Sequence, residues 1–142
     1  MESRVTKGTH EVLFKEGESA KALYIIKRGT VICLKRSKDR LIPVFRAEAG
    51  DVVGENAILG NNPYGYSAVT ITTAELVEIT TSNFKEILKN SPDWLVGLTA
   101  TMVQRFENTA HLVAENRVMN DAIMSEEEFT SSVENQFKKM LS

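Results

Sequence analysis

The residues of this sequence best suited to bind an anion or a sugar lie in one short stretch, residues 54–68. It reads GENAILGNNPYGYSA and joins two strand-like runs. Gly and Asn tolerate positive φ and Pro fixes φ, so the chain should leave one strand, form a short helical turn and come back. The backbone N–H groups at the start of such a turn can bind an anion. This stretch is therefore the candidate site, and the rest of the chain must position it.

Composition and charge narrow the classes of protein. The chain has 142 residues, of which 42% are hydrophobic and 25% charged, as in an ordinary soluble domain with a substantial core. A net charge of −2 does not provide the basic face that nucleic acids require. The sequence contains no apolar run of membrane-spanning length and no signal-peptide core. We expect a cytoplasmic protein that contacts neither membrane nor DNA.

An enzymatic function is not expected from these residue types. A jelly-roll metalloenzyme needs histidines and carboxylates on neighbouring strands, whereas His10 and His111 lie far apart in the sequence. Cys33 lies in an apolar run without a base beside it, which is typical of an inert core thiol. The sequence also lacks a G-x-S-x-G motif and a P-loop. We predict no catalytic residue, no metal and no cofactor.

The first half of the chain has the pattern of an antiparallel β structure. Short β-type runs alternate with turn residues, and Pro43 indicates an edge strand or a bulge because it cannot donate to a ladder. Residues 1–8 are polar and are expected to be irregular. The predicted strands cover residues 11–14, 22–26, 31–34, 41–45, 51–53 and 69–79. This spacing favours a β-roll or jelly roll.

After residue 79 the hydrophobic period becomes helical. Thr81 or Ser82 is expected to cap a short helix, and Ser91-Pro92-Asp93 starts a second one. Its apolar stripe continues to about residue 124, a length of roughly 50 Å, so part of it should project and find a partner. Asn116 lies either within this stripe as a buried register-setting residue or at its solvated edge.

A third helix is predicted at the end of the sequence. Ser125 followed by Glu128 reads as a capping box, so we expect residues 125–142 to form an amphipathic extension of a domain covering residues 1–124. Its apolar stripe carries Phe129, Val133 and Phe137, which would be a sticky surface if exposed. These side chains are therefore predicted to contact an unknown protein partner.

Several ordered motifs resemble the cyclic-nucleotide-binding domain family, and in particular its cAMP receptor protein-like members. They are FKEG at residues 14–17, LYII at residues 23–26, GTV at residues 29–31, and the Gly54-Glu55 and Ser67-Ala68 ends of a phosphate-binding cassette. The resemblance extends over residues 9–116. It implies an α+β fold: an antiparallel β-roll followed by a short helix, a long dimerisation-type helix and a C-terminal helix.

The resemblance also implies a ligand pocket, with cAMP or cGMP as the candidate ligand. Glu55 would accept from the ribose 2′-OH, Ser67 and the Ala68 N–H would bind the phosphate, and Thr109 would contact the adenine. Tyr66 stands where the family has arginine, which removes a charge and predicts an affinity lower by roughly 30- to 200-fold. The candidate site residues are Gly54, Glu55, Asn56, Ala57, Tyr66, Ser67, Ala68 and Thr109.

Two interpretations of this stretch remain open. In the first, Arg40 or Arg46 replaces the missing arginine, or the linker, about one residue longer than in the family, gives the anion a different geometry. In the second, Glu55 and Ser67 are satisfied by the backbone, and Tyr66, together with Tyr64, plugs the pocket. The sequence does not choose between them.

Two functions follow from these interpretations. The first is a non-enzymatic adaptor or regulator, homodimeric through the long helix, that signals through protein contacts with nucleotide binding weakened or lost. The alternative is a genuine receptor for a cyclic nucleotide or another small anion. Transcription regulators of this family continue into a helix-turn-helix domain, which this sequence does not contain, so DNA binding is not expected. Tyr66 favours the adaptor, and the retained Glu55 and Ser67 favour the receptor.

Overall fold

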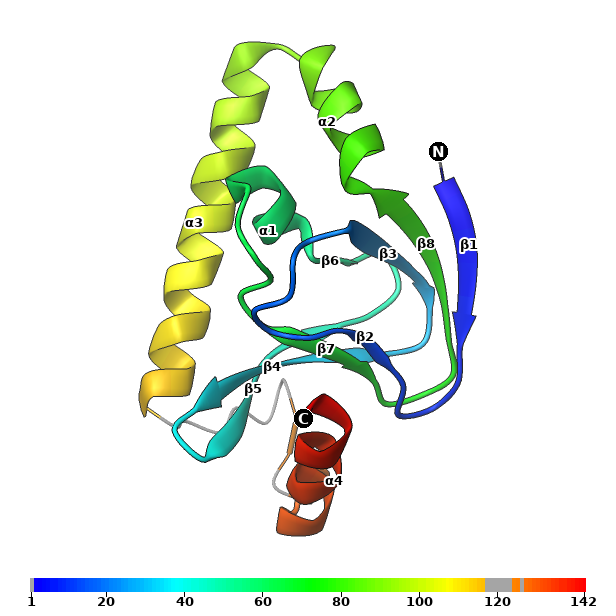
Figure 1. Ribbon diagram of the computed structural model, residues 1–142, viewed down its shortest axis with the longest axis vertical. Helices are drawn as coiled ribbons and strands as arrows, with labels where there is room; N and C mark the ends of the chain where they lie inside the picture. Colours follow the sequence, from blue (N-terminus) through cyan, green and yellow to red (C-terminus); the bar gives the residue numbers. More distant parts are fainter. Residues whose placement is uncertain (1, 117–123, 126) are drawn as a thin grey trace.

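The computed structural model describes residues 2–116, 124–125 and 127–142, and these form two four-stranded antiparallel sheets with helices around them (Figure 1). One sheet has the order β1 (Glu2–Lys7), β8 (Ala74–Thr80), β3 (Ala22–Arg28), β6 (Val52–Val53). The other has the order β2 (Val12–Phe14), β7 (Ser67–Thr70), β4 (Val31–Ser37), β5 (Arg40–Ala47). The helices are α1 (Glu55–Gly60), α2 (Thr81–Lys89), α3 (Asp93–Asn116) and α4 (Ser131–Leu141). The predicted α+β fold with an antiparallel β-roll is confirmed.

The alternation of side chains along β4 creates two separate apolar clusters. Val31 and Cys33 point into the space between the two sheets, whereas Ile32 and Leu34 point to the outer face of their sheet. All four are completely buried. The run reads as continuously apolar in the sequence because both faces of the strand are covered.

Helix α4 covers that outer face, which corrects one prediction. Phe137 is fully buried and Phe129 is 7% exposed, and both pack with Ile32, Leu34 and their neighbours of the outer cluster. Val133 is partly buried against the same cluster. Figure 1 shows α4 beneath the β4–β5 hairpin. The prediction that these three side chains contact a protein partner is wrong, because the chain's own sheet covers them.

The start of the last helix also differs from the prediction. Ser125 and Glu128 form the expected reciprocal capping bonds, at 3.1 and 3.2 Å, but they close only a single turn. A second cap follows: the Thr130 side chain accepts from the Val133 N–H at 3.3 Å, and α4 begins at residue 131. The break allows Phe129 to enter the outer cluster before the helix starts.

Three other strand predictions can be compared with the structure. Residues 1–8, expected to be irregular, include β1, which pairs with β8 along its whole length through the backbone. The predicted single strand at residues 69–79 is two strands, β7 and β8, that belong to different sheets. Pro43 lies in the edge strand β5 beside a register shift, so both parts of its prediction are confirmed.

Helices α2 and α3 extend from the roll as two arms joined at their far ends (Figure 1). The predicted start of the long helix is confirmed within one residue, and its predicted end near residue 124 involves residues 117–123, which lie outside the described part. The side chain of Asn116 is also outside it. Among the described helices none combines the length and the hydropathy needed to cross a bilayer.

Candidate functional site

The predicted helical turn in residues 54–68, the cassette segment, is present as α1. Gly54 precedes it with a φ of 87°, and Asn61 ends it with a φ of 55°, so both sequence signals for positive φ are used. A Cβ atom on Gly54 would lie 3.2 Å from the Ala22 carbonyl oxygen and 3.3 Å from the Tyr64 ring. Close packing as well as backbone conformation therefore requires glycine at the start of the turn.

Tyr66 closes the start of this turn. Its ring is 2% exposed, and its hydroxyl oxygen accepts a hydrogen bond of 2.9 Å from the Gly54 N–H. The ring also packs beside Phe14, with 5.6 Å between the ring centroids. The residue at the position of the family's arginine thus occupies an amide that would otherwise be available to an anion.

Tyr64 fills the neighbouring space. Its ring stacks on Phe14 with centroids 3.9 Å apart and is 5% exposed. Its hydroxyl donates to the Ala22 carbonyl at 2.6 Å and lies 3.2 Å from the N–H groups of Lys21 and Ala22. Both tyrosines pack as the plugged interpretation predicted.

The interior around Tyr66 disfavours negative charge. Burial raises the pKa of the Tyr66 phenol well above its ordinary value, and the nearby Cys33 thiol and Glu55 carboxylate raise that pKa further, although the Gly54 N–H lowers it. Burial likewise raises the pKa of Cys33, with a further contribution from Glu55. Burial is the largest cause of both shifts, and a phosphate anion that entered this interior without a partner charge would meet the same desolvation penalty.

Ser67 and Ala68 are held by strand pairing. The Ser67 hydroxyl accepts from the Glu16 N–H at 2.8 Å and is turned toward the loop before β3. Ala68 is fully buried between Phe14 of β2 and Cys33 of β4. Successive strand residues point to opposite faces, so the Tyr66 and Ser67 hydroxyls bind different amides and do not converge on one ligand.

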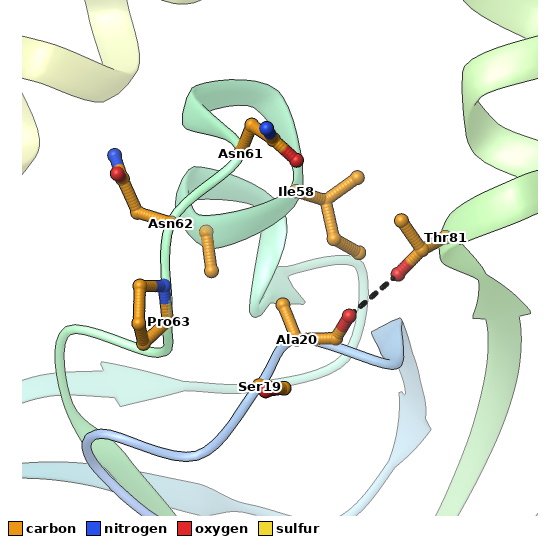
Figure 2. A pocket seen from close by; sticks show the side chains of 8 residues that line it. Ser19, Ala20, Ile58, Asn61, Asn62, Pro63 and Thr81 are labelled. Atoms are coloured by element: carbon orange, nitrogen blue, oxygen red, sulfur yellow. Dashed lines mark hydrogen bonds between the residues drawn. The ribbon is translucent and has the colours of Figure 1, made fainter.

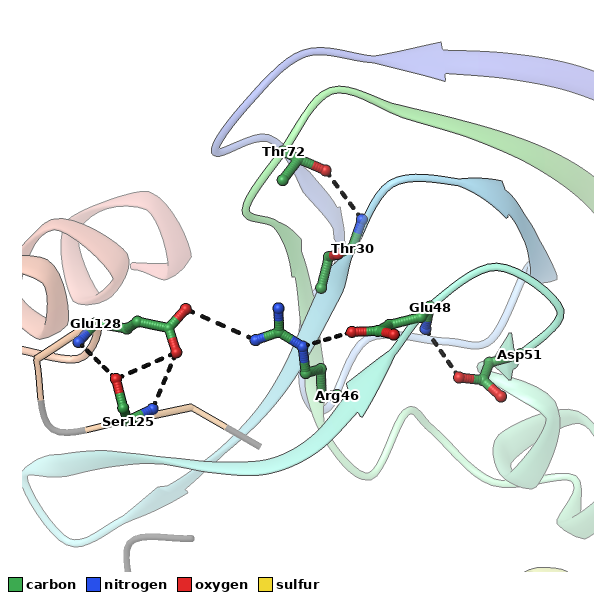
Figure 3. A network of polar contacts seen from close by, with 7 residues as sticks. All are labelled: Thr30, Arg46, Glu48, Asp51, Thr72, Ser125 and Glu128. Carbon is green, nitrogen blue, oxygen red and sulfur yellow. Dashed lines mark hydrogen bonds and ion pairs between the residues drawn. The ribbon is translucent and has the colours of Figure 1, made fainter. Parts of the chain in front are cut away.

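The two arginines proposed as replacements are engaged elsewhere. Arg40 Nε donates to Glu134 of α4 at 2.8 Å. Arg46 Nε donates to Glu48 at 2.8 Å, and Arg46 Nη1 lies 3.7 Å from Glu128, as Figure 3 shows. Both guanidinium groups therefore bind carboxylates in this structure, and whether either replaces the family's arginine stays a prediction.

The remaining predicted site residues are distributed as follows. Asn56 and Ala57 lie on α1 and are each 1% exposed, and Glu55 has one carboxylate oxygen, Oε2, buried beside them. Thr109 belongs to α3, but its side chain lies outside the described part of the structure. The structure therefore brings together Gly54, Glu55 and Tyr66, and adds Cys33 and Phe14, which sequence reasoning treated only as core or motif residues.

A cavity of about 240 Å³ lies between α1 and the first residue of α2 (Figure 2). The Thr81 hydroxyl at its edge donates to the Ala20 carbonyl at 2.9 Å. None of its eight lining side chains is charged, so the cavity supplies no counter-charge for an anion. The lining consists of Ser19, Ala20, Ala57, Ile58, Asn61, Asn62, Pro63 and Thr81. Within the described residues, no three histidine, cysteine or acidic side chains are grouped as metal ligands would be.

Comparisons with known proteins identify the family. Residues 4–91 match the family model "Cyclic nucleotide-binding domain", which is more than half of the chain. This chain belongs to the cyclic-nucleotide-binding domain family. It is 29% identical over 103 residues to the cAMP-activated global transcriptional regulator CRP of Escherichia coli, covering 71% of this chain and 49% of that protein. The chain thus spans about half the length of the curated relatives it matches.

Solved structures show the same fold. The EAL enzyme Bd1971 in its cAMP-bound form superposes with a TM-score of 0.70 at 20% identity, covering 81% of this chain and 31% of that one. The global regulator CLP of Xanthomonas campestris, described as c-di-GMP responsive, has a TM-score of 0.61 at 25% identity, covering 82% and 56%. The fold and the CRP-like regulatory class predicted from the motifs are confirmed.

The buried phenol predicts a loss of stability in alkaline solution. Tyr66 and Cys33 have folded-state pKa values raised above their ordinary values of 10.0 and 9.0. Their contribution is complete below pH 9 and declines at higher pH, where the unfolded chain releases protons that the folded chain retains. We expect the free energy of unfolding to fall by up to about 1.4 kcal/mol per pH unit per group.

Urea unfolding between pH 8 and 11 measures this effect. Tyr66→Phe should give a shallower decline above pH 10, and at neutral pH it should cost about 1–3 kcal/mol because the Gly54 N–H loses its acceptor. Phe14→Leu is the control, since it alters packing beside Tyr66 but removes no titrating group. An equally steep decline in wild type and Tyr66→Phe would contradict this account of the interior.

Proposed function

We propose that this chain is a non-enzymatic cytoplasmic adaptor or regulator whose cyclic-nucleotide-binding site is closed by its own tyrosine. The observation that carries the proposal is the 2.9 Å bond from the Gly54 N–H to the buried Tyr66 hydroxyl. A phosphate would have to displace this phenol and enter without the arginine's charge. Signalling then depends on contacts with proteins and not on a nucleotide.

The surface that supports homodimerisation lies on α3. Trp94, Leu98 and Met102 follow four-residue steps, and Leu95 lies three residues before Leu98. All four are 40–70% exposed, so they form one apolar stripe along the helix. Exposed apolar stripes of this kind are characteristic of helix–helix interfaces. We assign this stripe to a second copy of the chain, with α3 pairing with α3.

A receptor function is the second candidate, and one observation favours it. Glu55, which the family resemblance assigns to the ribose, is retained at the start of α1 with Oε2 buried toward the interior. Bd1971, which has the same fold, carries cAMP in its structure. For this chain, a receptor function requires Tyr66 to move out of the way.

Calorimetric titration with cAMP and cGMP distinguishes the two functions. We expect no heat of binding from the wild type at micromolar nucleotide, and saturable binding by Tyr66→Arg, which restores the charge. Tyr66→Met is the matched control: it removes the phenol but adds no charge, and it should bind at least tenfold more weakly than Tyr66→Arg. Micromolar binding by the wild type that is lost in Glu55→Ala would establish the receptor instead.

Sedimentation velocity tests the assigned dimer. The wild type should sediment as a dimer at micromolar concentration, and Leu98→Glu should shift it to a monomer because a charge enters the centre of the apolar stripe. Gln104→Glu adds the same charge to an exposed position away from the stripe and should leave the dimer intact. A wild type that is monomeric throughout the concentration range would refute the assignment.

A further inference from the structure

The strand that follows Tyr66 connects the candidate site with α4. On the inner side, Tyr66 and Ala68 belong to the cluster between the two sheets. On the outer side, Val69 belongs to the cluster that contains Phe137 of α4. Strands β2 and β4 pair with the two edges of β7. Its outer face is therefore supported by the cluster that includes α4, and its inner face by the cluster between the two sheets. A change in how α4 packs must therefore reach Tyr66 through a single strand.

A buried carboxylate attaches α4 to the sheet. Glu134 is 4% exposed, and its oxygens accept from Arg40 Nε at 2.8 and 3.0 Å and from the Leu41 N–H at 3.0 Å. Lys138, one turn along α4, lies 3.7 Å away. Arg40 and the Leu41 N–H both belong to β5, so charge-assisted bonds join the helix to an edge strand, with the carboxylate buried and the Arg40 side chain half exposed.

The rest of the attachment is apolar or exposed. Phe137 is fully buried and meets the ring of His10 edge-on, with centroids 5.7 Å apart. At the surface, Gln136 contacts His10 at 3.2 Å, and Lys15 Nζ donates to the Ser142 carbonyl at 3.4 Å. Exposed polar contacts of this kind contribute little to stability. The buried part of the attachment is therefore Glu134 together with Phe137 and the apolar side chains beside it, Val133, Met140 and Leu141.

We propose that α4 is an autoinhibitory clamp that keeps Tyr66 closed on Gly54. While α4 is docked, Val69 is packed and β7 is fixed, so the phenol stays on the amide. When α4 leaves the outer face, β7 loses the packing on that face, Tyr66 can separate from Gly54, and the site becomes accessible. This inference rests on the proposed function, because it assumes that Tyr66 is what closes the site.

Cys33 provides a natural reporter of this opening. It is the single cysteine of the sequence, it is fully buried, and it pairs with Ala68 across the β4–β7 ladder on the side facing Tyr66. A thiol reagent can reach it only when the interior opens. Its rate of modification in the folded full-length chain therefore measures how often the site is accessible.

The experiment compares modification of Cys33 by Ellman's reagent in four full-length proteins at neutral pH. Glu134→Gln removes the buried charge with little change of shape, and we expect Cys33 to react about tenfold faster than in the wild type. Arg40→Gln, whose side chain is half exposed in the wild type, removes the other partner and should act in the same direction. Glu127→Gln removes an equal charge from an exposed position before α4 and should react at the wild-type rate.

Low concentrations of urea separate clamp opening from unfolding of the whole domain. Local opening exposes little surface, so the accelerated rate should hardly depend on urea, whereas global unfolding depends on it steeply. Wild-type rates in both Glu134→Gln and Arg40→Gln, or an acceleration with the full urea dependence of unfolding, would overturn the clamp. Either result leaves the proposed function intact, since that function fails only if the wild type itself binds cAMP or cGMP in calorimetry.

Discussion

The hydrogen bond from the Gly54 amide to the Tyr66 hydroxyl is the interaction on which the account of this protein depends. The amide starts α1 in a buried position, and a buried N–H needs an acceptor. A phosphate oxygen is one group that can be such an acceptor. Here the phenol of the same chain is that acceptor, so the Gly54 amide is satisfied without any ligand.

Tyrosine in place of the family's arginine at position 66 also changes which charge the interior favours. An arginine at position 66 would stabilise an anion in the β-roll, but a neutral phenol does not. The interior instead raises the pKa of both Tyr66 and Cys33, with burial as the main cause. Retaining Glu55 adds a further negative group beside them. A cyclic phosphate would thus lose its hydration and gain no partner charge.

Much of the fold was predictable because glycines and apolar residues define strands locally. Gly54 and Asn61 need positive φ, and this requirement located α1 before any tertiary contact was known. The resemblance directed attention to Tyr66, but its partner was not predictable, since the Gly54 N–H is twelve residues away and meets the phenol only after the roll closes.

The errors have a common physical cause, which is tertiary pairing that leaves no local pattern. Strand β1 is polar and is stabilised by backbone pairing with β8. The apolar stripe of α4 was correctly predicted, but its partner is the outer face of β4 and β7, where Ile32, Leu34 and Val69 lie. A fully apolar run such as residues 31–34 indicates burial on both faces, and that signal was the available clue to a covering helix.

The most direct test of the central claim is the amide resonance of Gly54 in a ¹H–¹⁵N spectrum of the full-length protein. We expect this amide to exchange slowly with solvent and to keep its chemical shift when cAMP is added to millimolar concentration. In Tyr66→Phe the same amide should exchange faster and move, because its acceptor is gone. A Gly54 resonance in the wild type that shifts saturably with micromolar cAMP would show that a ligand replaces the phenol, and would contradict the account.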